Sequence, residues 1–61
     1  MNERIEVGDI VEKSKGHAEF GQSGIVVSRV TNSLGNTLLT VLTPVGTSVW
    51  YLPLVTKLSD V

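Results

Sequence analysis

Three side chains near the start of the chain could together bind an anion: Lys13, Lys15 and His17. Gly16 lies among them, and a glycine lets backbone N–H groups approach a phosphate closely. Such a loop would contact free phosphate or the backbone of a nucleic acid. Two carboxylates, Glu12 and Glu19, flank the cluster, and it lacks an aromatic platform for single-stranded bases. The sequence therefore favours a solvated loop with an ordinary surface histidine, with anion contact as the alternative.

No set of residues in the sequence predicts catalysis, a metal or a cofactor. Four carboxylates lie early in the chain: Glu3, Glu6, Asp9 and Glu12. They would share one exposed edge, where nothing would raise the pKa of any of them as acid or base catalysis needs. The chain has no cysteine and one histidine, too few for a zinc site. We expect a protein that is not an enzyme.

The glycines after the first charged cluster are expected to be turn residues. They are Gly16, Gly21 and Gly24. Their spacing matches neither the dinucleotide fingerprint nor the Walker pattern, and no predicted helix follows to bind a phosphate with its N-terminus.

Trp50 and Tyr51 are neighbours on a predicted strand, so their side chains point to opposite faces. Tyr51 shares a face with Val49, and we expect these two inside and Trp50 partly exposed. An exposed tryptophan is a favoured anchor for a binding partner. The alternative is that Trp50 covers the base of the loop between Lys13 and Gly24, stacked on Phe20.

The charges of the chain are placed unevenly. Between positions 25 and 56, Arg29 is the only residue that is charged at neutral pH. Isolated β-domains usually protect their strands with Lys or Glu, so a neutral, threonine-rich sheet face is typical of a surface that packs against protein. The alternative is that a very small domain simply uses Thr because it suits strands. Arg29 could pair with an acidic residue of another copy or extend to water. The expected partner-binding residues are Trp50, Arg29 and Phe20.

Size and composition limit the class of protein. A chain of 61 residues forms one domain, spanning 1–61, that buries only about 60% of its unfolded surface. A hydrophobic content of 41% is high for such a domain and favours a protein partner or a homo-oligomer. The net charge of −1 disfavours nucleic acid as the main partner. No stretch approaches the ~20 apolar residues that cross a bilayer, and no leader precedes the first strand. We expect a cytoplasmic protein, or one of the virion if the source is viral.

The order of turns and β-branched runs predicts an all-β domain of five strands. The expected strands are 9–13, 25–31, 37–43, 47–52 and 56–58. A long loop, 13–24, follows the first strand, and the segment 32–36 is a hairpin connection. Thr43-Pro44-Val45-Gly46 fits a type I turn, and Pro53 predicts a 3₁₀ turn before the last strand. No segment shows helical periodicity, so a small barrel is the expected architecture.

The pattern of glycines and apolar runs resembles an SH3-like barrel of the KOW type. It comprises Val7-Gly8-Asp9-Ile10-Val11, Gly24-Ile25-Val26-Val27, then Gly46 followed by Trp50-Tyr51 and the pair Leu54 and Leu58. The loop with His17 and the Val-Trp-Tyr run are similar to short tailed-bacteriophage proteins of unassigned function. SH3-like barrels serve many functions, so the resemblance implies a fold and not an activity.

One enzymatic relative is the pore-type homotetrameric dihydrofolate reductase, whose first strand resembles Gly8-Asp9-x-Val11. Its pore motif has an amide where this chain has bulky Trp50, so the resemblance does not carry over the active site. The expected function is a small interaction module that acts through self-association or a protein partner. A KOW-like nucleic-acid-binding accessory protein is the alternative, and a reductase is the remote one.

Overall fold

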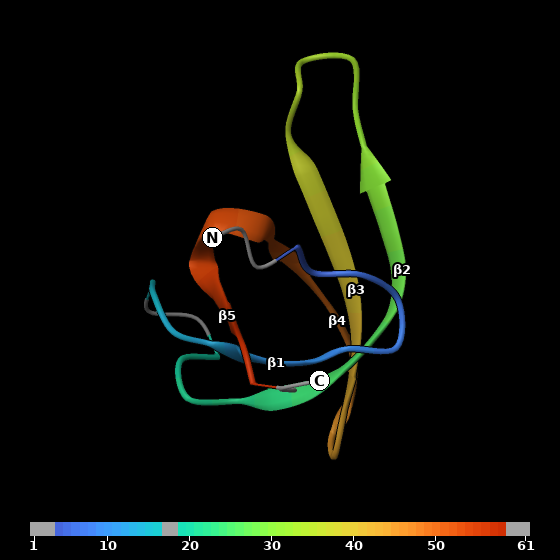
Figure 1. Ribbon diagram of the computed structural model, residues 1–61. Coiled ribbons are helices and arrows are strands. Elements are labelled where there is room, and N and C mark those ends of the chain that lie inside the picture. Colours follow the sequence, from blue (N-terminus) through green and yellow to red (C-terminus); the bar gives the residue numbers. More distant parts are fainter. Residues whose placement is uncertain (1–3, 17–18, 59–61) are drawn as a thin grey trace.

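The computed structural model describes residues 4–16 and 19–58, which form one antiparallel sheet of five strands (Figure 1). The strands are β1 (Ile10–Lys13), β2 (Ser23–Thr31), β3 (Thr37–Thr43), β4 (Gly46–Tyr51) and β5 (Val55–Lys57), and the 3₁₀ turn η1 (Leu52–Leu54) precedes β5. The sheet order is β4-β3-β2-β1-β5. The first four strands therefore form a meander, and the fifth returns to pair with β1. Five strands, a long loop after the first and a 3₁₀ turn before the last are confirmed.

The sheet is not closed, because β4 and β5 do not pair within the described part of the chain. Both strands are therefore ends of the sheet. The strand limits agree with the predicted ones to within two residues, and β3 matches at both ends. The fold is all-β, as predicted.

The core lies on the inner side of the sheet. Its buried apolar side chains are Ile5, Val11, Val26, Leu39, Val41 and Trp50, with Leu52 and Val55 packed against them. These residues follow from strand alternation: Val11 in β1 and both Leu39 and Val41 in β3 point the same way. The 3₁₀ turn, set by Pro53, then brings Val55 under the core.

Strand β2 is bent, and it pairs with β1 on one side and with β3 on the other. Val27 is the extra residue of a β-bulge between Val26 and Ser28, and a bulge increases local bend and twist. The first part of β2 pairs with β1, and its second part continues with β3 as a long hairpin. The tip of this hairpin projects beyond the rest of the molecule (Figure 1). The hydroxyl of Tyr51 donates to Asn36 Oδ1 at 2.8 Å and braces the hairpin from β4.

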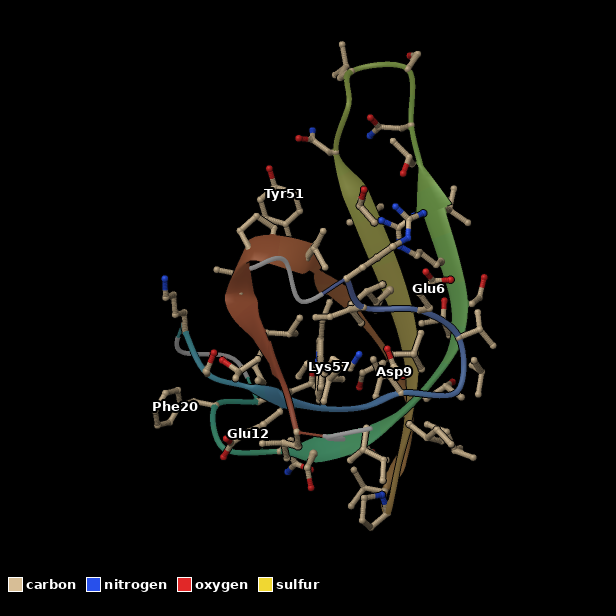
Figure 2. All side chains as sticks on the ribbon, viewed as in Figure 1. Glu6, Asp9, Glu12, Phe20, Tyr51 and Lys57 are labelled. Carbon is tan, nitrogen blue, oxygen red and sulfur yellow. The ribbon has the colours of Figure 1, made fainter. Side chains whose placement is uncertain are left out.

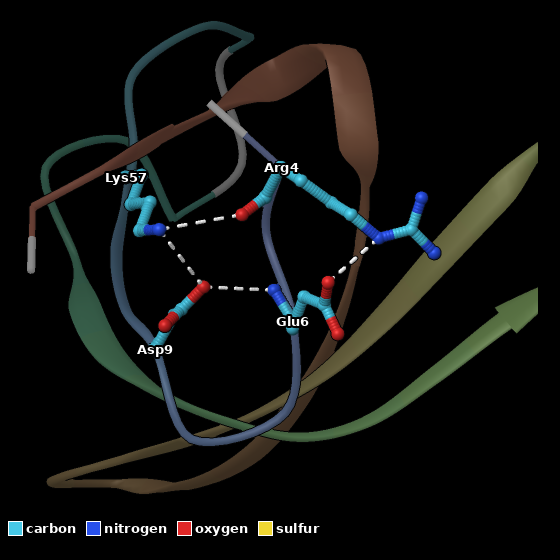
Figure 3. Close-up of polar contacts among 4 residues, drawn as sticks. All are labelled: Arg4, Glu6, Asp9 and Lys57. Atoms are coloured by element: carbon cyan, nitrogen blue, oxygen red, sulfur yellow. Dashed lines mark hydrogen bonds and ion pairs between the residues drawn. The ribbon is translucent and has the colours of Figure 1, made fainter. Parts of the chain in front are cut away.

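The segment 4–9, before β1, packs Ile5 into the core. Polar contacts hold this segment in place (Figure 3). The backbone turns between Glu6 and Asp9, where Gly8 has φ +100°. Asp9 accepts from the backbone N–H of Glu6 at 2.8 Å and pairs with Lys57 of β5 at 3.4 Å. Lys57 also donates to the carbonyl of Arg4 at 3.3 Å. These contacts tie the segment to β5 and seat Ile5 in the core.

Both predicted turns between long strands are present. In the 32–36 connection, the side chain of Asn32 accepts from the backbone N–H groups of Leu34 and Asn36. Between β3 and β4, Thr43 pairs with Gly46, which leaves Pro44 and Val45 as the turn. The Thr43 hydroxyl donates to the carbonyl of Gly46 at 2.7 Å. This short turn fixes the register of β4 on β3.

Candidate functional site

The outer side of the sheet, away from the core, carries three rows of side chains across β2, β3 and β4. Residues opposite each other in an antiparallel pair point to the same face. The rows are Val30–Leu38–Tyr51, Ser28–Thr40–Val49 and Ile25–Leu42–Thr47, and Ile10 of β1 extends the third. We call these ten residues the outer face.

Seven apolar side chains of the outer face remain in contact with solvent. They are Ile10, Ile25, Val30, Leu38, Leu42, Val49 and Tyr51, with exposed fractions between 38% and 62%. The polar residues among them are Ser and Thr. Within the described residues, the outer face therefore carries no charged side chain, and apolar side chains make up most of it.

Strand β3 explains why this patch exists. Its inner residues include Leu39 and Val41, and its outer residues include Leu38 and Leu42. A strand that is apolar on both sides is typical of a sheet covered on both faces. In this protein the core covers only the inner side. The outer face is therefore built like a second buried surface that nothing in the described chain covers.

The prediction for the Val49-Trp50-Tyr51 run is wrong. Trp50 is buried, with an exposed fraction of 2%, while Val49 and Tyr51 are exposed on the outer face. The cause is register, because Trp50 lies opposite Leu39 at the centre of the core. A buried Trp50 cannot anchor a partner directly. It instead covers the core beneath the loop between β1 and β2, which was the alternative interpretation.

Glu19 joins that loop to β4. Its carboxylate accepts a hydrogen bond from the hydroxyl of Ser48 and another from the indole N–H of Trp50 at 2.8 Å. The bond from Ser48 and the bond from Trp50 lower the pKa of the Glu19 carboxyl; desolvation opposes them, and the positive charge of Lys13 adds a lesser lowering effect. Glu19 has φ 59°, a left-handed conformation that only the loop geometry requires. The contact is therefore structural: it fixes the loop over the tryptophan.

The residues proposed for anion contact do not form one accessible cluster. Lys13 points to the inner side and is 5% exposed, with its amine near Gly16. Lys15 is exposed, and its backbone N–H donates to the carbonyl of Leu54. His17 lies outside the described residues. Lys13 is thus a buried part of the scaffold, and Lys15 is the lysine of this loop that faces solvent in the described part.

Phe20 and Arg29 lie apart from each other and from the outer face. Phe20 is 65% exposed and points away from the loop between β1 and β2 (Figure 2). Arg29 is half-buried and opposite Leu39, so it lies on the inner side of the β2–β3 hairpin. Its Nε is buried without a hydrogen-bond partner among the described residues. Phe20 does not cover Trp50: Trp50 is buried, whereas Phe20 is largely exposed.

Sequence reasoning predicted a neutral sheet face but did not identify its residues, and it considered Glu19 only as a charge that weakens anion binding. Counting from the Pro44–Val45 turn puts Val49 opposite Thr40, so the sequence could have given the rows of paired residues but not which side of the sheet they face. Glu19 has no such local signal, because its partners lie 29 and 31 positions away.

No group of three or more His, Cys, Asp or Glu residues within 4–16 and 19–58 could hold a metal ion. Within the same residues, no helix has the length and apolar character needed to span a bilayer. Compared with protein-family models, with curated proteins and with solved structures, the chain matches none of them.

Proposed function

We propose that this protein is a small non-enzymatic interaction module of SH3-like type that binds protein through its outer face. The observation that supports the proposal is the set of seven half-exposed apolar side chains with no charged residue among them. With exposed fractions between 38% and 62%, the seven together offer on the order of 600 Å², the upper end for a patch on a monomer. A patch of this kind is stabilised when another protein covers it.

The chemistry of the outer face favours protein over nucleic acid. Phosphate binding needs clustered Lys or Arg side chains that reach solvent. The loop that supplies them has Lys13 buried and flanking carboxylates, and Arg29 points to the inner side. The strand order, in which β5 returns to β1, is compatible with an SH3-like domain, but such domains serve many functions, so the proposal depends on the outer face and not on the fold.

Site-specific photo-crosslinking tests the proposal. A photoreactive residue replaces Leu42 on the outer face, and in a control chain it replaces Thr56, an exposed residue of β5. After irradiation of cells that express each chain, we expect a protein adduct from position 42 and little from position 56. Adducts to nucleic acid, equal yields from both positions or no adduct at position 42 would contradict the proposal.

A further inference from the structure

We propose that the outer face is covered by the outer face of a second copy of this chain, so that the protein is a two-fold symmetric dimer with two sheets packed face to face. This inference rests on the proposed function and specifies its partner. Sheets that pack in this way lie about 10 Å apart, and the side chains of the two facing surfaces interleave. In this dimer those surfaces are the two outer faces. The interface would then become the second core that β3 requires.

The first argument is the distribution of charge. Every charged residue of the chain except Arg29 lies before position 20 or after position 56, and Arg29 is on the inner side. Glu12 lies on the same side of β1 as Ile10, at the margin of the outer face. Two copies can therefore bring the three rows of β2, β3 and β4 together without placing like charges against each other. A different protein partner would normally be selected by complementary charges, and this face offers none. Interfaces between identical copies are the more apolar class.

The second argument is area. The apolar residues of the outer face offer on the order of 600 Å² per copy, and the Ser and Thr residues between them add to it, against ~800 Å² per partner in a standard interface. The whole chain exposes 4175 Å², so the dimer would cover a substantial share of it. A domain of this size gains stability in this way, since its single core is small.

The rows also place the symmetry axis. β3 is the middle of the three strands, and Thr40 is in the middle of the three rows, between Ser28 and Val49. In a face-to-face dimer centred on the patch, the Thr40 side chains of the two copies lie closest to the axis and to each other. A charge introduced at position 40 therefore faces its own equivalent.

Sedimentation of purified chains over a wide concentration range tests the dimer. The wild type should approach twice the chain mass of 6.6 kDa. Thr40→Lys and Thr40→Glu should each weaken self-association by about 100-fold, since like charges then meet at the axis. An equimolar mixture of the two should restore the dimer, because opposite charges face each other. Thr56→Lys, the same change on β5, should have no effect.

Several outcomes would overturn the inference: a wild type that stays at the monomer mass, Thr40 variants that remain dimers, or a mixture that does not recover. Amide NMR spectra show whether each variant is folded. If a variant does not fold, dilution of the wild type decides instead, because only outer-face amides should then shift. A monomer that still crosslinks to another protein through position 42 refutes the dimer and keeps the proposed function. A monomer without adducts refutes both.

Discussion

Trp50 and Glu19 are joined across 31 positions of sequence, the indole N–H of one donating to the carboxylate of the other at 2.8 Å. The same carboxylate accepts from Ser48 on the same strand. One loop residue therefore fixes both the largest buried side chain and the strand that carries it. Because the bond satisfies a buried donor, we expect the loop and the core to unfold together.

Replacing Glu19 by Ala should lower the urea midpoint and speed exchange of the indole proton of Trp50. The change leaves a buried N–H donor without its acceptor, which is more costly than losing an exposed contact. Phe20→Ala, in the same loop and exposed, serves as the control and should change neither value. Urea titration and NMR exchange of the indole proton measure both effects. Equal behaviour of the two variants would show that the Glu19 bond is unimportant.

The contribution of Glu19 to stability should depend on pH. Its folded-state pKa is lowered from the ordinary value of 4.5, chiefly by the bonds from Ser48 and Trp50. A group with a lowered pKa stabilises the fold fully above its ordinary value, and this contribution is lost as pH falls through the folded-state value. We expect the stability difference between wild type and Glu19→Gln to be constant above about pH 5.5 and to shrink in more acidic solution. A difference that grows on acidification would contradict this assignment.

Gly24→Ala should be strongly destabilising. A Cβ at this position would lie 2.7 Å from Cγ1 of Val41 and still closer to the carbonyl oxygen of Leu42. Because strand backbone cannot give way as a flexible side chain does, we expect a loss of about 3 kcal/mol or more in the free energy of unfolding. Gly8→Ala is the matched control, with open space but φ +100°, and should cost only about 1 kcal/mol. Chemical denaturation compares the two variants.

Leu39→Ala should remove about 2–5 kcal/mol of stability, because Leu39 is fully buried opposite Trp50 and its truncation leaves a cavity. For a domain of this size that is much of the total. The same change at Leu34, exposed at the hairpin tip, should stay within about 0.5 kcal/mol. Thermal unfolding followed by circular dichroism distinguishes them. Similar losses at both sites would mean that the core lies elsewhere.

The two ion pairs of the segment before β1 should contribute different amounts to the free energy of unfolding. Asp9 is mostly buried and both pairs with Lys57 and accepts from the N–H of Glu6. Asp9→Ala should therefore cost about 1–2 kcal/mol. The pair between Arg4 and Glu6 is exposed on both sides, so Arg4→Ala should cost less than about 0.5 kcal/mol. Urea titrations at low salt compare the two changes, and a larger effect of Arg4→Ala would refute this ranking.

The sequence was sufficient to predict the strands because their β-branched runs are separated by strong turn residues. β3 and its turn at Pro44 and Val45 were predicted at their observed limits. The face of Trp50 was not, because apolar residues on both sides of β4 leave strand alternation without a polar reference. Register decides the face, and register comes from pairing with β3.

The candidate site was less predictable than the strands. A neutral face was expected from the lack of charge after position 25, but Trp50 and Arg29, two of the residues chosen for it, point inward. The Glu19 contact depends on a loop conformation that no local pattern encodes. Long-range contacts of this kind arise only when the strands are already in place.

The segregation of charge gives the molecule the character of an amphiphile. Ionised groups gather around β1, β5 and the first loop, while the outer side of β2, β3 and β4 presents hydrocarbon and hydroxyl groups. A monomer in dilute solution should consequently adsorb to hydrophobic resins and to the air–water boundary by one side. Losses of protein to such surfaces should therefore be greatest in dilute solution, where the monomer prevails.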